Sequence, residues 1–269
     1  MLSALRKRII SSVLLIIISF AIILSELASG VVITILIILG LYEFFTMLEQ
    51  KQISIYKYFG IGMGAVIPIS IMLRFETTKG WELSFIILAL LFLFLMQFKR
   101  REISGAVVGI STTIFGILYI SWSLSFLIKI RYFPNGLGLL AALLLSTKLG
   151  DIGAYLVGSR FGKTPLIPRI SPKKSVEGAI GGLIFSILGI LACASFLKGV
   201  ASLWQIVLMG ILLGLLGQLG DLSESLLKRD CQIKDSGNFI PGIGGVLDLL
   251  DSLVFTAPVF YFFMSVVLR

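Results

Sequence analysis

The segment Glu82–Phe98 reads ELSFIILALLFLFLMQF, and its only charged residue is Glu82 at the first position. A helix that crosses the hydrocarbon core of a bilayer needs about 20 mostly apolar residues. Backbone polar groups in lipid must pair with one another, so such a run forms a helix. Only 14% of the 269 residues are charged and the mean hydropathy is +1.05, whereas soluble domains are roughly 25% charged. The sequence therefore predicts an all-α, polytopic membrane protein.

Nine apolar runs are long enough, or nearly so, to cross the membrane, which predicts a bundle of about nine transmembrane helices. The first run follows the basic stretch Arg6–Arg8, as in a signal peptide, but no cleavage site with a soluble domain follows, so we expect a retained span. The fifth is over-long and contains Gly116, so we expect it to tilt or break. The predicted spans are 9–26, 30–48, 57–75, 82–98, 103–127, 137–158, 176–197, 202–220 and 246–268.

The distribution of basic residues predicts the orientation in the membrane. Sixteen of the 23 Lys and Arg residues lie in segments on the same side as the N-terminus, six lie on the other side, and Lys148 lies within a span. Cytoplasmic loops are enriched in Lys and Arg. We therefore expect an integral protein of the inner or cytoplasmic membrane, with the N-terminus cytoplasmic and the C-terminus outside.

Composition excludes several kinds of chemistry. The chain has no histidine, so a histidine base, a histidine-metal site and histidine-ligated haem are excluded. Two cysteines, Cys193 and Cys231, predict no disulfide framework. The net charge of +9 fits membrane topology and anionic ligands better than nucleic acid in so apolar a chain.

The acidic residues divide the chain into two parts. Every aspartate lies in the segment from Asp151 to Asp251. The acidic residues of the first half are all glutamates, and most of them lie at span ends. We therefore expect residues 1–128 to form an N-terminal transmembrane scaffold and residues 129–269 to form the catalytic region.

Two motifs precede the richest part of the sequence. In the first, Lys148–Tyr155, Asp151 lies near the end of an apolar helix, where a carboxylate usually faces a cavity, although Lys148 three residues away could simply pair with it. In the second, Ser171–Gly178, two adjacent lysines with flanking hydroxyls suit a phosphate. On charge alone, positive-inside topology together with attraction to anionic lipid headgroups explains the lysines better than a phosphate site does. The residues concerned in the second motif are Ser171, Lys173, Lys174 and Ser175, the last of which could also cap the next helix.

The third motif is Gly220–Arg229. Asp221, Glu224 and Lys228 recur at helical spacing and share one face, so the helix at 202–220 is expected to continue past the membrane edge. A stalk stabilised by i, i+4 ion pairs is the alternative interpretation.

The fourth motif, Lys234–Ser252, begins as a Gly- and Pro-rich loop and enters the last span. Asp248 and Asp251 lie three residues apart on one face of that helix, where two unpaired carboxylates repel each other and lose hydration. A divalent cation would remove both penalties, and oxygen ligands without His favour Mg²⁺ over Zn²⁺. Helix capping would explain Asp248 but not Asp251. Carboxylates, Mg²⁺ and basic residues together indicate phosphoryl or nucleotidyl transfer to a lipid.

The segment Ser225–Asp251 resembles the signature of the phosphatidate cytidylyltransferases, the CDP-diacylglycerol synthases, and the first two motifs look like that family's earlier motifs. The resemblance covers roughly residues 145–255. There are two departures, because Ile243 and Leu249 stand where the family usually has His and Arg. The matching positions are Ser225, Lys228, Arg229, Lys234, Asp235, Gly237, Ile240, Pro241, Gly244, Gly245, Val246, Asp248 and Asp251.

The resemblance implies Mg²⁺-dependent transfer of CMP from CTP to phosphatidate in phospholipid biosynthesis, with room for a second cation. It implies catalytic roles for Asp221, Asp248, Lys228, Arg229 and Lys234. It implies metal ligation by Asp221, Asp248 and Asp251. It implies substrate binding by Lys173, Lys174, Ser171, Ser175, Glu224, Ser225, Asp235, Gly244, Gly245 and Asp151. The expected partners are CTP, phosphatidate and membrane lipid, with a homodimer and no nucleic acid.

Three other functions remain open from the sequence. Two are enzymatic: a CTP-dependent lipid kinase and a cytidylyltransferase for another lipid phosphate. The third is a secondary transporter that uses buried Asp and Lys. Transporters often contain repeated halves, and the acidic residues here are concentrated in one half.

Overall fold

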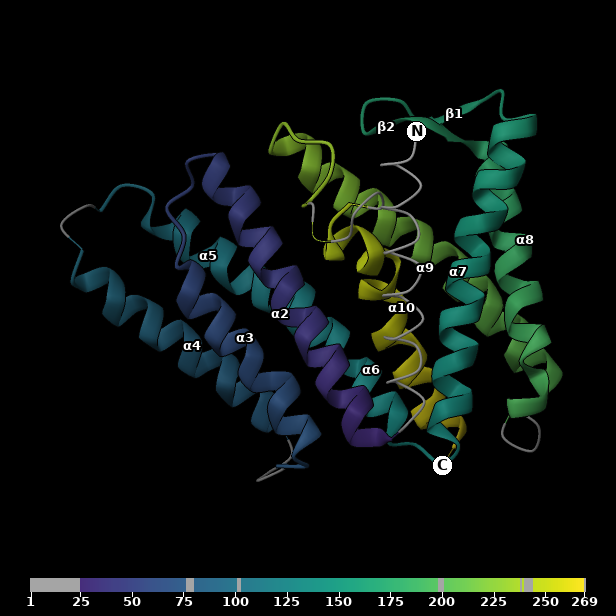
Figure 1. Ribbon diagram of the computed structural model, residues 1–269, viewed down its shortest axis with the longest axis horizontal. Helices are drawn as coiled ribbons and strands as arrows, with labels where there is room; N and C mark the ends of the chain where they lie inside the picture. Colours follow the sequence, from purple (N-terminus) through teal and green to yellow (C-terminus); the bar gives the residue numbers. More distant parts are fainter. Residues whose placement is uncertain are drawn as a thin grey trace, which may run out of the picture. The chain divides into compact units, whose positions relative to one another are not determined.

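The computed structural model describes residues 25–75, 80–100, 103–197, 201–237, 239 and 244–268. The predicted first span, 9–26, lies outside the described residues except for its last two positions. The described chain forms two compact units, one made of residues up to 128 together with 231–249, and one made of 129–230 together with 250–269 (Figure 1).

The first unit is built from apolar helices. In Figure 1, α2 and α3 lie side by side, and α2 buries Ile37, Leu41, Phe44 and Phe45 almost completely. These side chains recur at the spacing that places them on the inner face of one helix. The elements are α2 (Glu26–Gln50), α3 (Lys57–Met72), α4 (Trp81–Phe98), α5 (Ala106–Gly116), the π-helical segment η1 (Ile117–Trp122) and the start of α6 (Ser123–Arg131).

The irregularity expected in the run 103–127 is a π-helical segment rather than a break. The helix continues from Ala106 to Arg131, and its π-helical part begins directly after Gly116. A Cβ atom at Gly116 would lie 2.8 Å from a ring carbon of Phe44 and 2.9 Å from one of Phe45. Glycine at this position therefore lets α2 pack against the backbone where the helix changes its winding.

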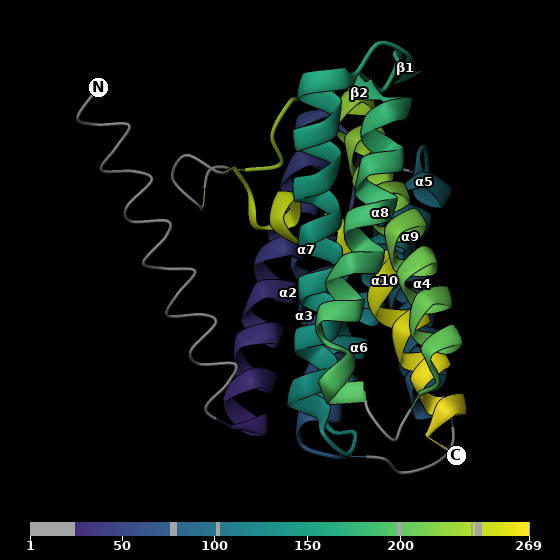
Figure 2. The same cartoon turned by 90° about the vertical axis from the view of Figure 1, so that its right-hand side faces the viewer.

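The second unit is centred on α7, α8 and α9, which lie side by side in Figures 1 and 2. The elements are α7 (Gly136–Phe161), β1 (Pro165–Ile167), β2 (Ser171–Ser175), α8 (Val176–Ala192), the 3₁₀ turn η2 (Ala194–Leu197) and α9 (Leu203–Asp230). The last helix, α10 (Val246–Val267), contributes its residues from Leu250 onward to this unit.

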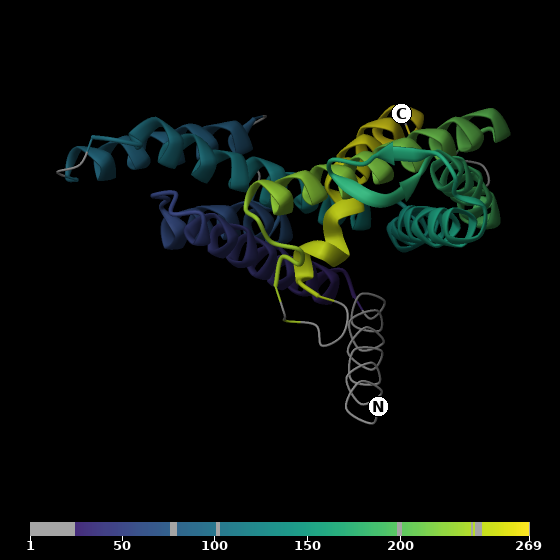
Figure 3. The ribbon, with the colours of Figure 1, turned by 90° about the horizontal axis from the view of Figure 1, so that it is seen from above.

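A short hairpin replaces the loop that the sequence predicted before α8. Strands β1 and β2 are antiparallel, with Pro165 opposite Ser175 and Ile167 opposite Ser171, and the hairpin lies beside the start of α8 (Figure 3). Strands of three and five residues give too little periodicity to be recognised in a sequence. The predicted capping role of Ser175 is confirmed, because its side chain accepts a hydrogen bond from the Gly178 N–H at 3.1 Å.

Helices α7 and α8 approach closely through glycines. A Cβ atom at Gly153 would lie 2.4 Å from Cβ of Phe185, and one at Gly181 would lie 2.5 Å from Cβ of Val157. Small residues of this kind allow helices in lipid to pack at short distance, where dispersion forces are strongest. The pairing of α7 with α8 sets the position of the polar residues at their ends.

Six of the described helices are long and apolar enough to cross a membrane: α2, α4, the Ala106–Arg131 helix, α7, α9 and α10. Helices α3 and α8 are apolar but shorter. The chain is therefore an all-α integral membrane protein. The predicted continuation of 202–220 is also confirmed, since α9 runs for 28 residues to Asp230.

We expect Gly181→Val to lower the free energy of unfolding by about 1–3 kcal/mol, because the new side chain would overlap Val157 at a close helix contact. The control is Gly62→Val in α3, where a Cβ atom meets nothing within 4 Å. Thermal unfolding in detergent compares the two variants. Equal midpoints would show that the α7–α8 contact does not need glycine.

Candidate functional site

A cavity of about 490 Å³ lies in the second unit, at the hairpin end of the helices. It brings together the first two sequence motifs and the start of the third, from four different elements. Its polar lining residues are Asp151 and Ser159 of α7, Ser171, Lys173, Lys174 and Ser175 of β2, and Gln218 and Asp221 of α9; Tyr155 and Gly178 also line it. Six of the predicted site residues therefore line one cavity, and their functional roles stay predictions.

The charged centre of this cavity is an ion pair between β2 and α9. Lys174 Nζ lies 2.7 Å from Asp221 Oδ2, and both side chains are partly exposed, at 26% and 36%. The Ser225 hydroxyl lies 3.4 Å from the other oxygen of Asp221. Because partly exposed ion pairs contribute only about 0–1 kcal/mol to stability, both charges can be redirected to a ligand at little cost.

Two further carboxylates share one hydroxyl. Ser252 Oγ lies 3.2 Å from Asp151 Oδ2 and 2.9 Å from Asp251 Oδ1. Lys148 Nζ lies 3.0 Å from Asp151 Oδ2, so the predicted pair forms, and yet Asp151 still lines the cavity. Asp251 is only 8% exposed. The backbone of α10 meets α9 here, because a Cβ atom at Gly220 would lie 2.4 Å from the Asp251 carbonyl oxygen.

The remainder of the third motif holds α9 and its neighbours together. Glu224 is fully buried and forms an ion pair with Lys228, the i, i+4 pair that the spacing allowed. Arg229 Nε donates to the Ile170 carbonyl oxygen at 3.3 Å, which ties the end of α9 to the hairpin turn. The predicted catalytic roles of Lys228 and Arg229 stay predictions.

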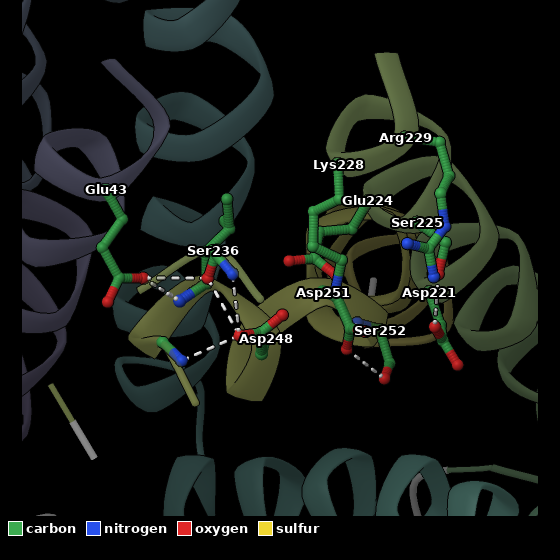
Figure 4. Close-up of polar contacts among 12 residues, drawn as sticks. Glu43, Asp221, Glu224, Ser225, Lys228, Arg229, Ser236, Asp248, Asp251 and Ser252 are labelled. Atoms are coloured by element: carbon green, nitrogen blue, oxygen red, sulfur yellow. Dashed lines mark hydrogen bonds and ion pairs between the residues drawn. The ribbon is translucent and has the colours of Figure 1, made fainter. Parts of the chain in front are cut away.

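In the first unit, Asp248 organises the loop before α10 (Figure 4). Its Oδ2 accepts hydrogen bonds from Gly245 N at 2.7 Å, Ser236 N at 3.1 Å and Ser236 Oγ at 3.0 Å. The side chain reaches back over the first turn of the helix, as in a capping box. Asp248 therefore caps α10, as the capping interpretation predicted. Its role as a Mg²⁺ ligand stays a prediction.

The predicted loop residues around this carboxylate differ in exposure. Lys234 and Asp235 are exposed, whereas Gly245 is buried. Gly244 has φ of +128°, a conformation that residues with a Cβ atom rarely adopt. A Cβ atom there would also lie 2.7 Å from Asp248 Oδ2. Glycine at position 244 is therefore required by the approach of the Asp248 carboxylate to the backbone.

Four polar residues of these two regions were missed by the sequence analysis: Glu43, Gln218, Ser236 and Ser252. Glu43 had a usable signal, because a carboxylate inside a predicted span is costly and usually functional. Gln218 bonds the Ala179 carbonyl oxygen at 3.0 Å. Gln218, Ser236 and Ser252 are ordinary in composition, and only the fold gives them their partners.

Within the described parts of the chain, no three acidic or cysteine side chains are grouped closely enough to hold a metal ion by themselves. Mg²⁺ usually binds through one or two carboxylates and completes its coordination with water and substrate phosphates. The carboxylate oxygens of Asp151, Asp221, Asp248 and Asp251 are donors of that chemical type. The carboxylates of either unit, taken by themselves, therefore fit the chemistry of a Mg²⁺ ion that arrives with an anionic substrate.

Comparison with known proteins identifies the class. Residues 6–267 match the model of the Cytidylyltransferase family, so the chain belongs to this family of nucleotidyltransferases.

Individual relatives agree with this assignment. The chain is 33% identical to a phosphatidate cytidylyltransferase of Synechocystis sp., over 97% of both chains. It is 32% identical to a phosphatidate cytidylyltransferase of Staphylococcus saprophyticus, over 81% of this chain and 85% of the relative. A protein of the same name from Mycobacterium bovis is 41% identical over 54% of this chain and 47% of its own.

We expect Ser175→Ala to lower the free energy of unfolding by about 1 kcal/mol, because α8 loses its N-cap. Ser159→Ala is the matched control: Ser159 lines the same cavity, but its exposed hydroxyl bonds only the Leu156 carbonyl oxygen of its own helix. That change should stay within about 0.5 kcal/mol. Equal losses in thermal unfolding would contradict the capping role.

Proposed function

We propose that this protein is a phosphatidate cytidylyltransferase, which transfers CMP from CTP to phosphatidate and releases pyrophosphate. The observation that carries the proposal is the cavity in which Lys173 and Lys174 meet Asp151 and Asp221. This is a basic and acidic site at the end of apolar helices, in a chain of the cytidylyltransferase family. The names of the relatives that match over most of their length support the same substrates.

The reaction requires an acceptor that is already nucleophilic. A phosphate oxygen of phosphatidate attacks the α-phosphorus of CTP, the bond from that phosphorus to the bridging oxygen breaks, and pyrophosphate leaves with the bond electrons. A phosphate monoester dianion needs no strong base, so a site without histidine is sufficient. The tasks left to the protein are to position two anions and to stabilise their charge.

The lysines of β2 are suited to hold phosphates. Lys174 already contacts a carboxylate in the cavity, and an incoming phosphate offers the same kind of acceptor oxygen. Ser171 and Ser175 place hydroxyls in the same lining. The α8 N-terminus beside Ser175 adds backbone N–H groups and a positive helix end. We assign this part of the cavity to the phosphates of the substrates.

We keep Asp221, Asp248 and Asp251 as proposed Mg²⁺ ligands, with Asp151 as a further carboxylate, on the strength of the family resemblance. When bound, Mg²⁺ supplies charge stabilisation for the phosphoryl oxygens and the leaving pyrophosphate. A second cation is part of the proposal because four carboxylates are available. Lys228, Arg229 and Lys234 are proposed to contribute positive charge, and Glu224, Ser225, Asp235, Gly244 and Gly245 to shape the substrate site.

The membrane arrangement is proposed on the sequence pattern. We infer nine spans, with the N-terminus and the site on the cytoplasmic side and the C-terminus outside, since the basic residues are distributed in that way. We also infer a homodimer. Acyl chains of phosphatidate would enter the site sideways from the bilayer.

A direct assay tests the function. Purified protein is incubated with CTP labelled in the α-phosphate, Mg²⁺ and phosphatidate, and the lipids are extracted. Label in CDP-diacylglycerol supports the proposal. A phosphorylated lipid together with free CDP would indicate a lipid kinase, and no lipid product would overturn the proposal.

We expect Lys174→Met to lower kcat/KM for CTP by about 30-fold, because the variant loses a hydrogen bond to a charged phosphate, which contributes about 1.5–3 kcal/mol. The thermal midpoint should hardly change. Lys163→Met is the matched control, since Lys163 is an exposed lysine just before β1 that does not line the cavity. Equal kinetics for both variants would remove Lys174 from the phosphate site.

The two departures from the family pattern give a second prediction. Ile243 lies outside the described residues, and Leu249 is a partly buried residue of α10. We expect the double change Ile243→His and Leu249→Arg to raise activity and to lower the KM for CTP, because Arg neutralises phosphate charge and Leu does not. Steady-state kinetics with varied CTP measures both. Unchanged constants would show that these positions are dispensable in this protein.

A further inference from the structure

Glu43 is a buried carboxylate in the middle of an apolar helix. It lies on α2 and is only 2% exposed. Its Oε1 accepts a hydrogen bond from Val246 N at 2.9 Å, and its Oε2 accepts one from Leu247 N at 2.8 Å. Each carboxylate oxygen therefore receives one of the first two backbone N–H groups of α10.

These contacts explain how α2 tolerates the charge. The first N–H groups of a helix have no partner within the helix, and that end of the helix is positive. A carboxylate there satisfies the donors and gains electrostatic stabilisation, so both buried groups are compensated. Glu43 thereby fixes where α10 begins.

Ser236 connects Glu43 to Asp248. The Ser236 hydroxyl oxygen lies 3.2 Å from Glu43 Oε2 and 3.0 Å from Asp248 Oδ2, and Ser236 is 8% exposed. Its backbone N–H also donates to Asp248 Oδ2 at 3.1 Å. One serine therefore holds the loop against both carboxylates, and a shift of Glu43 is passed on directly to Asp248.

The loop glycines are placed for this contact. A Cβ atom at Gly237 would lie 2.4 Å from Glu43 Oε1, and one at Gly245 would lie 2.5 Å from Glu43 Oε2. Both positions belong to the motif that contains Asp248, yet here the glycines make room for a side chain of α2. The backbone N–H of Gly245 donates to Asp248 at 2.7 Å.

We propose that Glu43 is a positioning residue that aims the Asp248 carboxylate at its metal. The inference rests on the proposed function only in taking Asp248 as a Mg²⁺ ligand. The contacts of Glu43 described above are with protein groups, namely two backbone N–H groups of α10 and the Ser236 hydroxyl. It acts through the start of α10, through Ser236 and through the two glycines of the loop.

Glu43→Gln tests this with little change in size. The amide offers one acceptor oxygen in place of two, and its NH₂ group faces a backbone donor. Residues that orient a metal ligand typically change metal affinity 10–100-fold when replaced. We expect the Mg²⁺ concentration for half-maximal CMP transfer to rise about tenfold, with the KM for phosphatidate unchanged.

A binding measurement separates this from a loss of stability. The thermal midpoint is followed during Mg²⁺ titration in the presence of CTP, and Glu43→Gln should need about tenfold more Mg²⁺ for the same rise. Glu49→Gln is the matched control: Glu49 also lies on α2 but pairs with Lys57 at 2.8 Å, and this variant should leave the Mg²⁺ dependence unchanged.

A second variant tests the same contact from the loop. Gly245→Ala should raise the Mg²⁺ requirement as Glu43→Gln does, and combining the two changes should not raise it further. If Glu43→Gln does not fold, Ser236→Ala gives the same comparison.

The outcomes distinguish this inference from the proposed function. A lower midpoint with an unchanged Mg²⁺ dependence would make Glu43 purely structural and overturn the inference. So would a wild-type protein whose midpoint does not respond to Mg²⁺, or an Asp248→Asn variant that retains the response. Absence of CMP transfer with a normal Mg²⁺ response would remove the proposed function and leave the positioning role of Glu43 intact.

Discussion

The structure depends on the requirement that every charge within an apolar helix finds its partner inside the protein. Water is absent from the hydrocarbon core, so an uncompensated carboxylate there costs several kcal/mol. Glu224 meets the requirement with Lys228, one turn along α9, and Glu43 meets it with the backbone of α10. The bonds of Glu43 also fix the position of α2 against the start of α10. Polar residues at the helix ends, such as Asp151 and Asp221, line the cavity instead.

Glycine makes the second contribution, because it sets how closely these helices approach. At Gly181 the neighbouring helix leaves no room for a side chain. At Gly237 and Gly245 the Glu43 carboxylate occupies the space that a side chain would need, together with the Ser236 hydroxyl at Gly245. The same residue type therefore serves packing in lipid in one place and close contact with a polar group in another. The hairpin β1–β2 adds Lys174 to the acidic end of α9, a contact that helices alone would not provide.

Hydropathy was sufficient to predict the all-α membrane class and the approximate position of every described helix, because apolar runs in lipid have one structural solution. The motifs were sufficient to predict that Asp151, Lys174 and Asp221 lie together, and the cavity confirms it. The hairpin was not predictable, since its strands are too short to show periodicity. The partners of Glu43 and Ser252 were not predictable either, because they depend on helix register. Glu43 lies in the part of the chain that was predicted to be a scaffold. A carboxylate inside a predicted span indicates a functional residue, but Glu43 is far in sequence from the four motifs and was therefore not selected.

The bonds from Glu43 to α10 join residues 203 and 204 positions apart in the sequence. A ribosome completes α2 long before it reaches the donors that this carboxylate needs. The nascent chain therefore carries an ionisable side chain in an apolar segment until the residues 203 and 204 positions further on have been made. The first turn of α10 relieves this penalty, so we expect the start of that helix and the Asp248 loop to become ordered together during biogenesis.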